Sequence, residues 1–173
     1  MQEKLKELSS VVVPEDVTID FSDGIETEPA SLDSEQTEIV SYTDSQIVIS
    51  GPGSGKTRIL TEKARSLLSS GQNILCLTFT RSAAKEMGLR VPTVPATTIH
   101  SYCCGNVGWK DDWGYSGLLF RFLKSENKTK FDWILVDECQ DLNEMEFDVV
   151  LSLSGSKIFA VGDPYQSIYG FQG

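Results

Sequence analysis

Apolar and polar residues alternate in blocks along most of this chain, and the blocks have two different periods. Four short apolar runs are bounded by polar turn formers, at residues 46–51 (QIVISG), 73–80 (NILCLTFT), 131–138 (FDWILVDE) and 157–163 (KIFAVGD). Runs of this kind are typical of strands that are buried on both faces of a sheet. We therefore predict a strand in each of these four ranges.

Between these runs, apolar residues recur at the spacing of a helix. The helical pattern covers residues 56–68, 82–91 and 143–153, and an earlier helix is predicted through Val40, with Asp33 or Ser34 as its N-cap. Strands that alternate with helices predict an α/β fold, in which a parallel sheet carries helices on both faces. Residues 105–117, which are rich in glycine and aromatic side chains, are predicted to form a loop.

The beginning of the chain differs from the rest in charge. Residues 1–30 hold eight acids and two lysines, and the net charge of the whole chain is −10. We expect residues 1–31 to form a flexible or loosely docked arm, with an inhibitory or partner-binding arm as the alternative, and residues 32–173 to form one domain. The composition lacks the basic excess of a typical nucleic-acid-binding protein, so nucleic-acid binding should be local and weak at physiological salt.

The sequence has neither a run of apolar residues that could span a membrane nor the features of a secretory signal. No apolar run is long enough to span a bilayer, and the start, MQEKLKELSS, carries charges where a secretory signal needs apolar residues. We expect a cytoplasmic protein without a membrane partner.

The four cysteines form no CxxC pair, and the single histidine, His100, lies three residues before Cys103. This spacing disfavours a metal site, so we expect free thiols, buried in the case of Cys76 and Cys139.

The strongest chemical signal is SGPGSGKT at residues 50–57, between the first predicted strand and the helix after it. In this context the sequence predicts a phosphate-binding loop, whose glycines let backbone N–H groups surround phosphates at a helix N-terminus. Lys56 would reach the β- and γ-phosphates, and Thr57 would ligate Mg²⁺. The strict form of the motif begins with glycine, and Ser50 stands there instead. A residue this small should still fit.

An acidic pair, Asp137 and Glu138, ends the third predicted strand, 81 positions after Lys56. Ligands of open α/β sheets bind at the carboxyl ends of the strands. Asp137 can hold the Mg²⁺ shell, and Glu138 can orient or deprotonate a water. Two acids after an apolar run are weak evidence for a metal- and water-binding site by themselves, because strand ends often carry acids. After a phosphate loop in an α/β chain, the same pair becomes strong evidence for such a site.

Together these motifs resemble the first RecA-like domain of UvrD-like superfamily 1 DNA helicases, which is a P-loop NTPase fold. The resemblance is carried, in order, by LDSEQTEIV (32–40, Q motif), GPGSGKTRIL (51–60, Walker A), LTFTRSAAKEM (77–87, motif Ia), TTIHSY (97–102, motif Ib), VDECQD (136–141, motif II) and GDPYQSIYGFQG (162–173, motif III). It implies the ATP-hydrolysing motor domain of a DNA helicase, with ATP and Mg²⁺ as its ligands.

For the nucleotide, the resemblance implies that Gln36 reads adenine, that Arg58 packs on the base and that Gln166 senses the γ-phosphate. The predicted ATP site comprises Gln36, Gly51, Pro52, Gly53, Ser54, Gly55, Lys56, Thr57 and Arg58. The predicted catalytic group is Lys56, Asp137, Glu138 and Gln166, and the predicted metal ligands are Thr57 and Asp137.

For DNA, the resemblance implies contacts from motifs Ia, Ib and III. Tyr169 and Phe171 would stack on bases of single-stranded DNA, Phe79 would offer another base contact, and Thr80, Arg81 and His100 would contact phosphates or the DNA backbone. Stacking suits a translocating motor because every base has a π-face. Without the resemblance, Tyr169 and Phe171 would be surface aromatics and His100 an ordinary helix-start residue. Weak binding without sequence preference is expected.

Three departures from the family pattern limit these expectations. Only 37 positions separate His100 from Asp137, so the helical domain usually inserted there is reduced or absent. Gln172 replaces the arginine that typically ends motif III, and the second RecA-like domain is missing. In the family that domain supplies γ-phosphate arginines and an aromatic lid on adenine. We therefore expect slow ATP hydrolysis unless a second RecA-like domain or a protein partner is added.

Two other interpretations remain open from the sequence. The chain can be a natural stand-alone domain that acts as a regulator or binds a partner without unwinding DNA, rather than a truncated helicase. A small P-loop kinase or GTPase is the other, and it is disfavoured by the matches to motifs Ia, Ib and III and by the lack of a guanine-reading N-K-x-D.

Overall fold

The computed structural model describes residues 31–126 and 128–163. The predictions for residues 1–30 and for Gln166, Tyr169, Phe171 and Gln172 lie outside the described residues. The helices are α1 Ser34–Ser41, α2 Lys56–Ser69, α3 Arg81–Arg90, α4 Ile99–Val107, α5 Gly114–Lys124 and α6 Glu144–Leu153. The strands are β1 Gln46–Ile49, β2 Ile74–Thr78, β3 Ala96–Thr98, β4 Phe131–Val136 and β5 Ser154–Gly162.

These strands form one sheet of five strands in the order β1-β5-β4-β2-β3, and every neighbouring pair is parallel. The predicted α/β class with a parallel sheet is therefore confirmed. β5 lies between β1 and β4, so the strand before the phosphate loop and the strand before the acidic pair are not direct neighbours. Because the carboxyl ends of parallel strands meet at one edge of a sheet, the segments that follow β1, β5 and β4 come together there.

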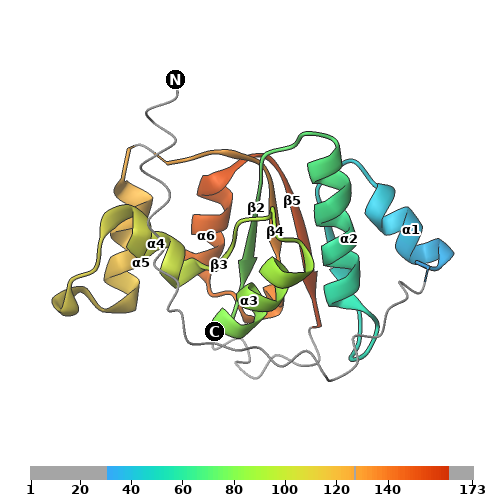
Figure 1. The fold of residues 1–173 in the computed structure, drawn as a ribbon. Coiled ribbons are helices and arrows are strands. Elements are labelled where there is room, and N and C mark those ends of the chain that lie inside the picture. Colours follow the sequence, from blue (N-terminus) through green and yellow to red (C-terminus); the bar gives the residue numbers. More distant parts are fainter. Residues whose placement is uncertain (1–30, 127, 164–173) are drawn as a thin grey trace, which may run out of the picture. The chain divides into compact units, whose positions relative to one another are not determined.

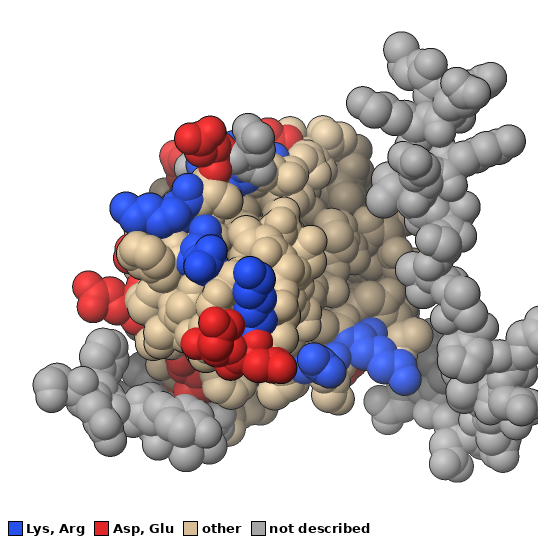
Figure 2. Space-filling view, turned by 90° about the vertical axis from the view of Figure 1, so that its left-hand side faces the viewer, with Lys and Arg blue, Asp and Glu red and all other residues tan. Residues whose placement is uncertain are grey.

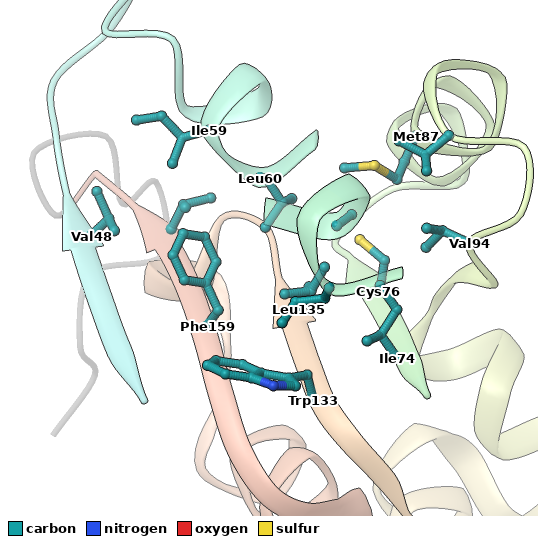
Figure 3. Close-up of a cluster of buried hydrophobic side chains, with 14 residues drawn as sticks. Val48, Ile59, Leu60, Ile74, Cys76, Met87, Val94, Trp133, Leu135 and Phe159 are labelled. Atoms are coloured by element: carbon teal, nitrogen blue, oxygen red, sulfur yellow. The ribbon is translucent and has the colours of Figure 1, made fainter. Parts of the chain in front are cut away.

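Helices cover both faces of the sheet, as predicted (Figure 1). On one face, α2 and α3 contribute buried side chains, among them Ile59, Leu60 and Met87, which pack with Val48, Cys76, Leu135 and Phe159 of the strands (Figure 3). On the other face, α4, α5 and α6 contribute Cys103, Leu118, Phe122 and Val149, which pack with Leu75, Leu77, Ile134 and Val136. Successive strand residues point to opposite faces. Because helices cover both faces, the residues that point to either face are apolar, which explains the unbroken apolar runs in the sequence.

Local signals determine where two of the helices begin. Asp33 is the N-cap of α1, and its side chain accepts a hydrogen bond from the backbone N–H of Gln36 at 2.8 Å. The Gln36 side chain accepts one in return from the backbone N–H of Asp33 at 3.3 Å. Asn143 and Glu146 form the same reciprocal cap at the start of α6. Such a cap satisfies backbone donors that the first helical turn leaves open.

The structure corrects the prediction that residues 105–117 form a loop. α4 extends to Val107, a short 3₁₀ turn spans Asp111–Trp113, and α5 begins at Gly114. Four glycines within residues 105–117 hide the helical pattern in the sequence. Tertiary packing stabilises α5, because Leu118, Leu119 and Phe122 are buried. The sequence pattern also does not indicate β3, which has only three residues.

All four cysteines are free thiols, as predicted. Cys76 is fully buried, whereas Cys139 is only half-buried, which corrects the expectation for that residue. Burial raises the pKa of Cys76 and of Cys103 to about 12, so both stay protonated at neutral pH. No helix in the described residues is both long enough and apolar enough to cross a membrane.

Candidate functional site

The predicted phosphate loop connects the end of β1 at Ile49 to the start of α2 at Lys56. Gly53 and Gly55 adopt left-handed backbone conformations, with φ of 73° and 82°, which residues with a Cβ rarely adopt. The Ser54 hydroxyl lies 2.9 Å from the Ser50 hydroxyl and donates to the Gly51 carbonyl at 2.7 Å. Ser50, which stands where the strict motif has glycine, therefore takes part in the hydrogen bonding of the loop.

The Lys56 side chain lies along the inside of this loop. Its amine donates to the carbonyl oxygens of Ser50 at 3.3 Å and Gly51 at 3.4 Å, and it lies 3.9 Å from Oδ2 of Asp163. Only 10% of the Lys56 side chain is exposed, and Asp163 is fully buried. The amine is thus placed between the loop and the end of β5, where it would meet phosphate groups held by the loop.

Gln36, the predicted adenine-reading residue, lies beside the loop. A Cβ added to Gly55 would lie 3.3 Å from the Gln36 side-chain nitrogen, so the glycine leaves room for this amide. Pro52 is exposed and Arg58 is partly exposed on the first turn of α2. The structure therefore brings all the predicted ATP-binding residues to one edge of the sheet.

Lys63 anchors the end of α1 near this site. Its amine donates to the Tyr42 carbonyl and, at 3.0 Å, to the Val40 carbonyl, and it lies 4.8 Å from the centre of the Trp133 ring. Burial, with a smaller effect from Lys157, lowers the pKa of Lys63. A cation at the C-terminus of a helix satisfies carbonyls that the helix leaves open. The position of α1, and of Gln36 on it, therefore depends on a buried side chain of α2.

The acidic pair lies at the end of β4, where Asp137 bonds through its backbone N–H to the Leu77 carbonyl at 2.9 Å. Burial first, and then the neighbouring Glu138 carboxylate, raise the pKa of Asp137 to about 6, against the lowering effect of the Glu138 N–H and of Lys56. Glu138 has φ of 51°, the only positive φ of a non-glycine residue in the described part of the chain. Its left-handed backbone ends the strand and begins the 3₁₀ turn Cys139–Asp141.

Gln140 connects the acidic pair to the end of β5. Its side-chain oxygen accepts a hydrogen bond from the backbone N–H of Asp163 at 2.9 Å, and its side-chain nitrogen donates to Glu138 Oε2 at 2.9 Å. A Cβ on Gly162 would lie 2.6 Å from this side-chain oxygen, so the close approach requires glycine. The sequence prediction assigned no role to Gln140 or Asp163, although both lie inside the quoted motifs, VDECQD and GDPYQSIYGFQG.

A cavity of about 490 Å³ opens between the acidic pair, the start of α2 and α3. It is lined by the predicted metal ligands Thr57 and Asp137, by Glu138 and Gln140, and by Glu86 and Asp141. No group of three or more His, Cys, Asp or Glu side chains in the described residues is placed to hold a metal ion. This donor set fits a cation such as Mg²⁺ that takes one or two carboxylate ligands and completes its shell with water or phosphate oxygens.

A second cavity, of about 370 Å³, lies beside the first at the same edge. Phe79, Arg81 and His100, three of the predicted DNA contacts, line it together with Tyr115 and Glu146. Phe79 and Asp137 line both cavities. Thr80 lines the first cavity instead, and its hydroxyl caps α3 by accepting a hydrogen bond from the Ala83 N–H at 3.1 Å.

His100 of α4 and Tyr115 of α5 form one wall of this second cavity. The His100 ring lies near both Trp109 and Tyr115, with ring centres 5.4 and 5.5 Å away. The Tyr115 hydroxyl donates to the carboxylate of Glu146, and burial followed by this bond raises the pKa of Tyr115. From the sequence we predicted only a loop over residues 105–117, because the tertiary structure alone brings Trp109 and Tyr115 to His100.

Comparison with known proteins agrees with this arrangement. Residues 36–172 match a family described as AAA domain. ATP-dependent DNA helicase PcrA of Staphylococcus epidermidis is 42% identical over 86 residues, and PcrA of Staphylococcus aureus is 39% identical over 85 residues. Each alignment covers 42% of this chain and 12% of the helicase, so the chain matches a small part of the length of these relatives. The predicted resemblance to UvrD-like helicases is confirmed.

Among solved structures, Pif1 of Bacteroides sp. aligns with a TM-score of 0.47 and 19% identity, over 80% of this chain and 34% of that chain.

Proposed function

The chain belongs to the AAA domain family, and on this premise we propose that it binds ATP with Mg²⁺ as part of a UvrD-like DNA helicase motor. One observation carries the proposal. Lys56 of the phosphate loop faces Asp163, and Gln140 connects Asp163 to Glu138. A continuous series of contacts thus joins the lysine that would meet the phosphates to the carboxylate that would orient a water.

The phosphate loop would hold the triphosphate. A Cβ added to Gly51 or Gly53 would find no atom within 4 Å, so no other part of the described chain crowds these two positions. Lys56 would neutralise phosphate charge, and Gln36 would contact the adenine edge through its amide. Thr57 and Asp137 would hold Mg²⁺, which polarises phosphate oxygens when bound.

Hydrolysis should be slow in this chain by itself. Glu138 would orient or deprotonate the water, and a hydrogen bond from Gln140 would hold the Glu138 carboxylate in place. Among the described residues, those that line the cavity beside Glu138 include no Lys or Arg. Charge that develops on the transferred phosphoryl group therefore needs a further cation besides Lys56 and the metal ion, and an arginine supplied in trans can raise the rate by ~10³–10⁵. Gln166, the proposed γ-phosphate sensor, lies outside the described residues.

Single-stranded DNA is the proposed second ligand. The cavity lined by Phe79, Arg81 and His100 offers an aromatic face and a cation, which suit a base and a phosphate. The net charge of −10 opposes the binding of a polyanion, so we propose weak binding without sequence preference. Tyr169 and Phe171, the other proposed stacking residues, lie outside the described residues.

A second RecA-like domain or a protein partner would complete the motor. The alternative is a helicase-derived ATP-binding domain that regulates or binds a partner without unwinding DNA, and the lack of a cation in the described lining of the catalytic cavity is compatible with it. Cytoplasmic location remains a prediction.

Calorimetry with Mg²⁺-ATP tests the proposal directly. We expect modest affinity for the wild type, no binding for Lys56→Ala, and unchanged binding for Lys85→Ala, which removes an exposed lysine of α3. If the wild type binds no Mg²⁺-ATP at millimolar nucleotide, the proposal is wrong.

Steady-state phosphate release then separates the two interpretations. A motor domain should hydrolyse ATP slowly by itself and faster when a second RecA-like domain is added, and Glu138→Gln should lose this gain. If the added domain gives no gain while ATP still binds, the regulatory interpretation is supported.

A further inference from the structure

We infer that a groove beside α5 is a second contact site for single-stranded DNA, separate from the cavity at Phe79 and His100. This inference rests on the proposed function and extends it to residues that the helicase motifs do not include. The groove encloses about 630 Å³. It is lined by Val107, Trp113, Gly117, Phe120, Arg121, Lys124 and Ser125.

The groove combines cations with aromatic rings that are held together in the folded protein. The guanidinium carbon of Arg121 lies 4.0 Å from the centre of the Trp113 ring, and the Lys110 amine lies 5.5 Å from the same ring. The Lys124 amine lies 5.6 Å from the centre of the Phe120 ring. A cation over an aromatic face is attracted to it, so these flexible side chains are already partly ordered. Less entropy is then lost when a ligand binds.

The charge of this region differs from that of the chain. None of the described groove residues is acidic, and α5 has two basic residues in its last turn and no acid in its first turn. Figure 2 views the side on which α4 and α5 lie, where several Lys and Arg side chains stand among uncharged residues, with Asp and Glu side chains beside them. Asp111 and Asp112 lie in the turn before α5, and Asp111 accepts a hydrogen bond from the Trp109 indole at 3.0 Å. A net-acidic protein that keeps such a local cationic site is suited to an anionic ligand.

Exposed aromatic surface indicates what kind of anion fits. Phe120 is 55% exposed although it is large and apolar, and the Arg121 guanidinium presents a flat cation next to it in sequence. Bases of single strands stack on aromatic rings and on arginine planes, while Lys and Arg contact the phosphates. A fully paired duplex does not offer its base faces in this way. Among polyanions, single-stranded DNA therefore fits the groove best.

The groove also lies along a path from the cavity at Phe79 and His100. His100 is in the first turn of α4 and lines that cavity, whereas Val107 ends α4 and lines the groove. A helix rises 1.5 Å per residue, so these two positions are about 10 Å apart along α4. A strand that contacts His100 and continues along α4 would reach Trp113 and Arg121. A short oligonucleotide would fill only the cavity at Phe79 and His100.

The test compares two double variants that each remove one arginine and one lysine. Arg121→Gln/Lys124→Gln changes the groove, and Arg65→Gln/Lys85→Gln removes the same charge from exposed positions of α2 and α3. Fluorescence anisotropy is measured with labelled oligo(dT) of about 16 and about 4 nucleotides. For the longer strand, we expect the groove variant to weaken affinity at low salt at least about tenfold. The slope of log K against log salt should fall by about 1.4, the value for two lost phosphate contacts.

The control variant should keep the wild-type salt slope, and the groove variant should bind the shorter strand like the wild type. Trp113→Ala should weaken binding of the longer strand for all sequences alike, whereas Phe147→Ala, which removes an exposed ring of α6, should not. Thermal melts identify variants that fail to fold.

Three outcomes overturn the inference: equal effects of the two double variants, an equal effect of the groove variant on both strand lengths, or a preference for duplex. If Phe79→Ala still weakens binding in any of these cases, the proposed function stands without the groove. If the wild type binds no single-stranded DNA while it binds Mg²⁺-ATP, both DNA sites are wrong and the nucleotide site remains.

Discussion

The side-chain nitrogen of Lys56 lies 3.9 Å from Oδ2 of Asp163, a carboxylate with no exposure to solvent. Lys56 is the first residue of α2, and Asp163 follows the last residue of β5. The pair therefore joins the loop after β1 to the neighbouring strand of the sheet. A buried carboxylate needs a cation or hydrogen-bond donors near it, so Asp163 helps to hold the amine at the base of the phosphate loop.

Lys56→Ala should therefore destabilise the fold as well as remove ATP binding. Removing the cation leaves the buried Asp163 carboxylate with less compensation, at a cost of up to about 3 kcal/mol in the free energy of unfolding. Adding Asp163→Asn to Lys56→Ala should restore much of this stability without restoring ATP binding. Chemical denaturation measures the stability, and calorimetry measures the binding. Additive effects of the two substitutions on stability would contradict a direct interaction.

Asp137→Asn should stabilise the protein at neutral pH although it removes a proposed metal ligand. The pKa of Asp137 is about 6 in the folded protein, above the value of about 3.9 for an unfolded chain. Between these values the folded state binds more protons, so the stability of the wild type falls as pH rises through this window. An asparagine carries no charge and avoids this loss.

Melting temperatures of the wild type and Asp137→Asn across pH 4 to 8 check this prediction. The advantage of the variant should be largest above about pH 6, and it should disappear near pH 4, where Asp137 is protonated in the wild type. Added Mg²⁺ with nucleotide should raise the melting temperature of the wild type more than that of the variant. A lower melting temperature of Asp137→Asn at pH 8 would contradict the pKa argument.

Gly162→Ala should separate the acidic pair from the end of β5. The added Cβ would lie 2.6 Å from the side-chain oxygen of Gln140 and 2.8 Å from the sulfur of Cys139, so both side chains must move. We expect a loss of about 1–3 kcal/mol in stability. ATP hydrolysis should fall more than ATP binding, because Gln140 holds Glu138 but not the phosphate loop. Gly88→Ala, with no atom within 4 Å of the added Cβ, is the matched control.

Lys63→Met should loosen α1 while it keeps most of the buried volume. The Val40 and Tyr42 carbonyls would lose their donor, at a cost of about 1–3 kcal/mol. Because Gln36 lies on α1, the preference for ATP over CTP should decrease, whereas the affinity for tripolyphosphate should hardly change. Lys85→Met, at an exposed position, serves as the control. An equal loss of tripolyphosphate affinity would show that Lys63 does not act through α1.

Several features of this protein follow from its sequence because each depends on short-range pattern. Alternating strand and helix periods predicted the α/β class, and glycines before Lys56 predicted a phosphate loop. The start of α1 was predicted to within one residue, with Asp33 or Ser34 as its N-cap, since a capping side chain acts on the backbone only three residues away, and the structure shows Asp33 in this role. The acidic pair after a buried strand predicted the second half of the site, because parallel strands bring their carboxyl ends to one edge.

The tertiary structure decided what depends on residues far apart in the chain. The order of the strands placed β5 between β1 and β4, and this brought Asp163 to Lys56 and to Gln140. Nothing in the sequence distinguishes Lys63 from other lysines of an amphipathic helix. In the structure it is buried against carbonyls at the end of α1 and against the Trp133 ring. The α5 helix and its groove also needed the fold, because the energy that orders this glycine-rich stretch comes from burying Leu118, Leu119 and Phe122 against the sheet. The local pattern of apolar and polar residues does not show which distant segments pack together. These contacts could therefore be identified only from the tertiary structure.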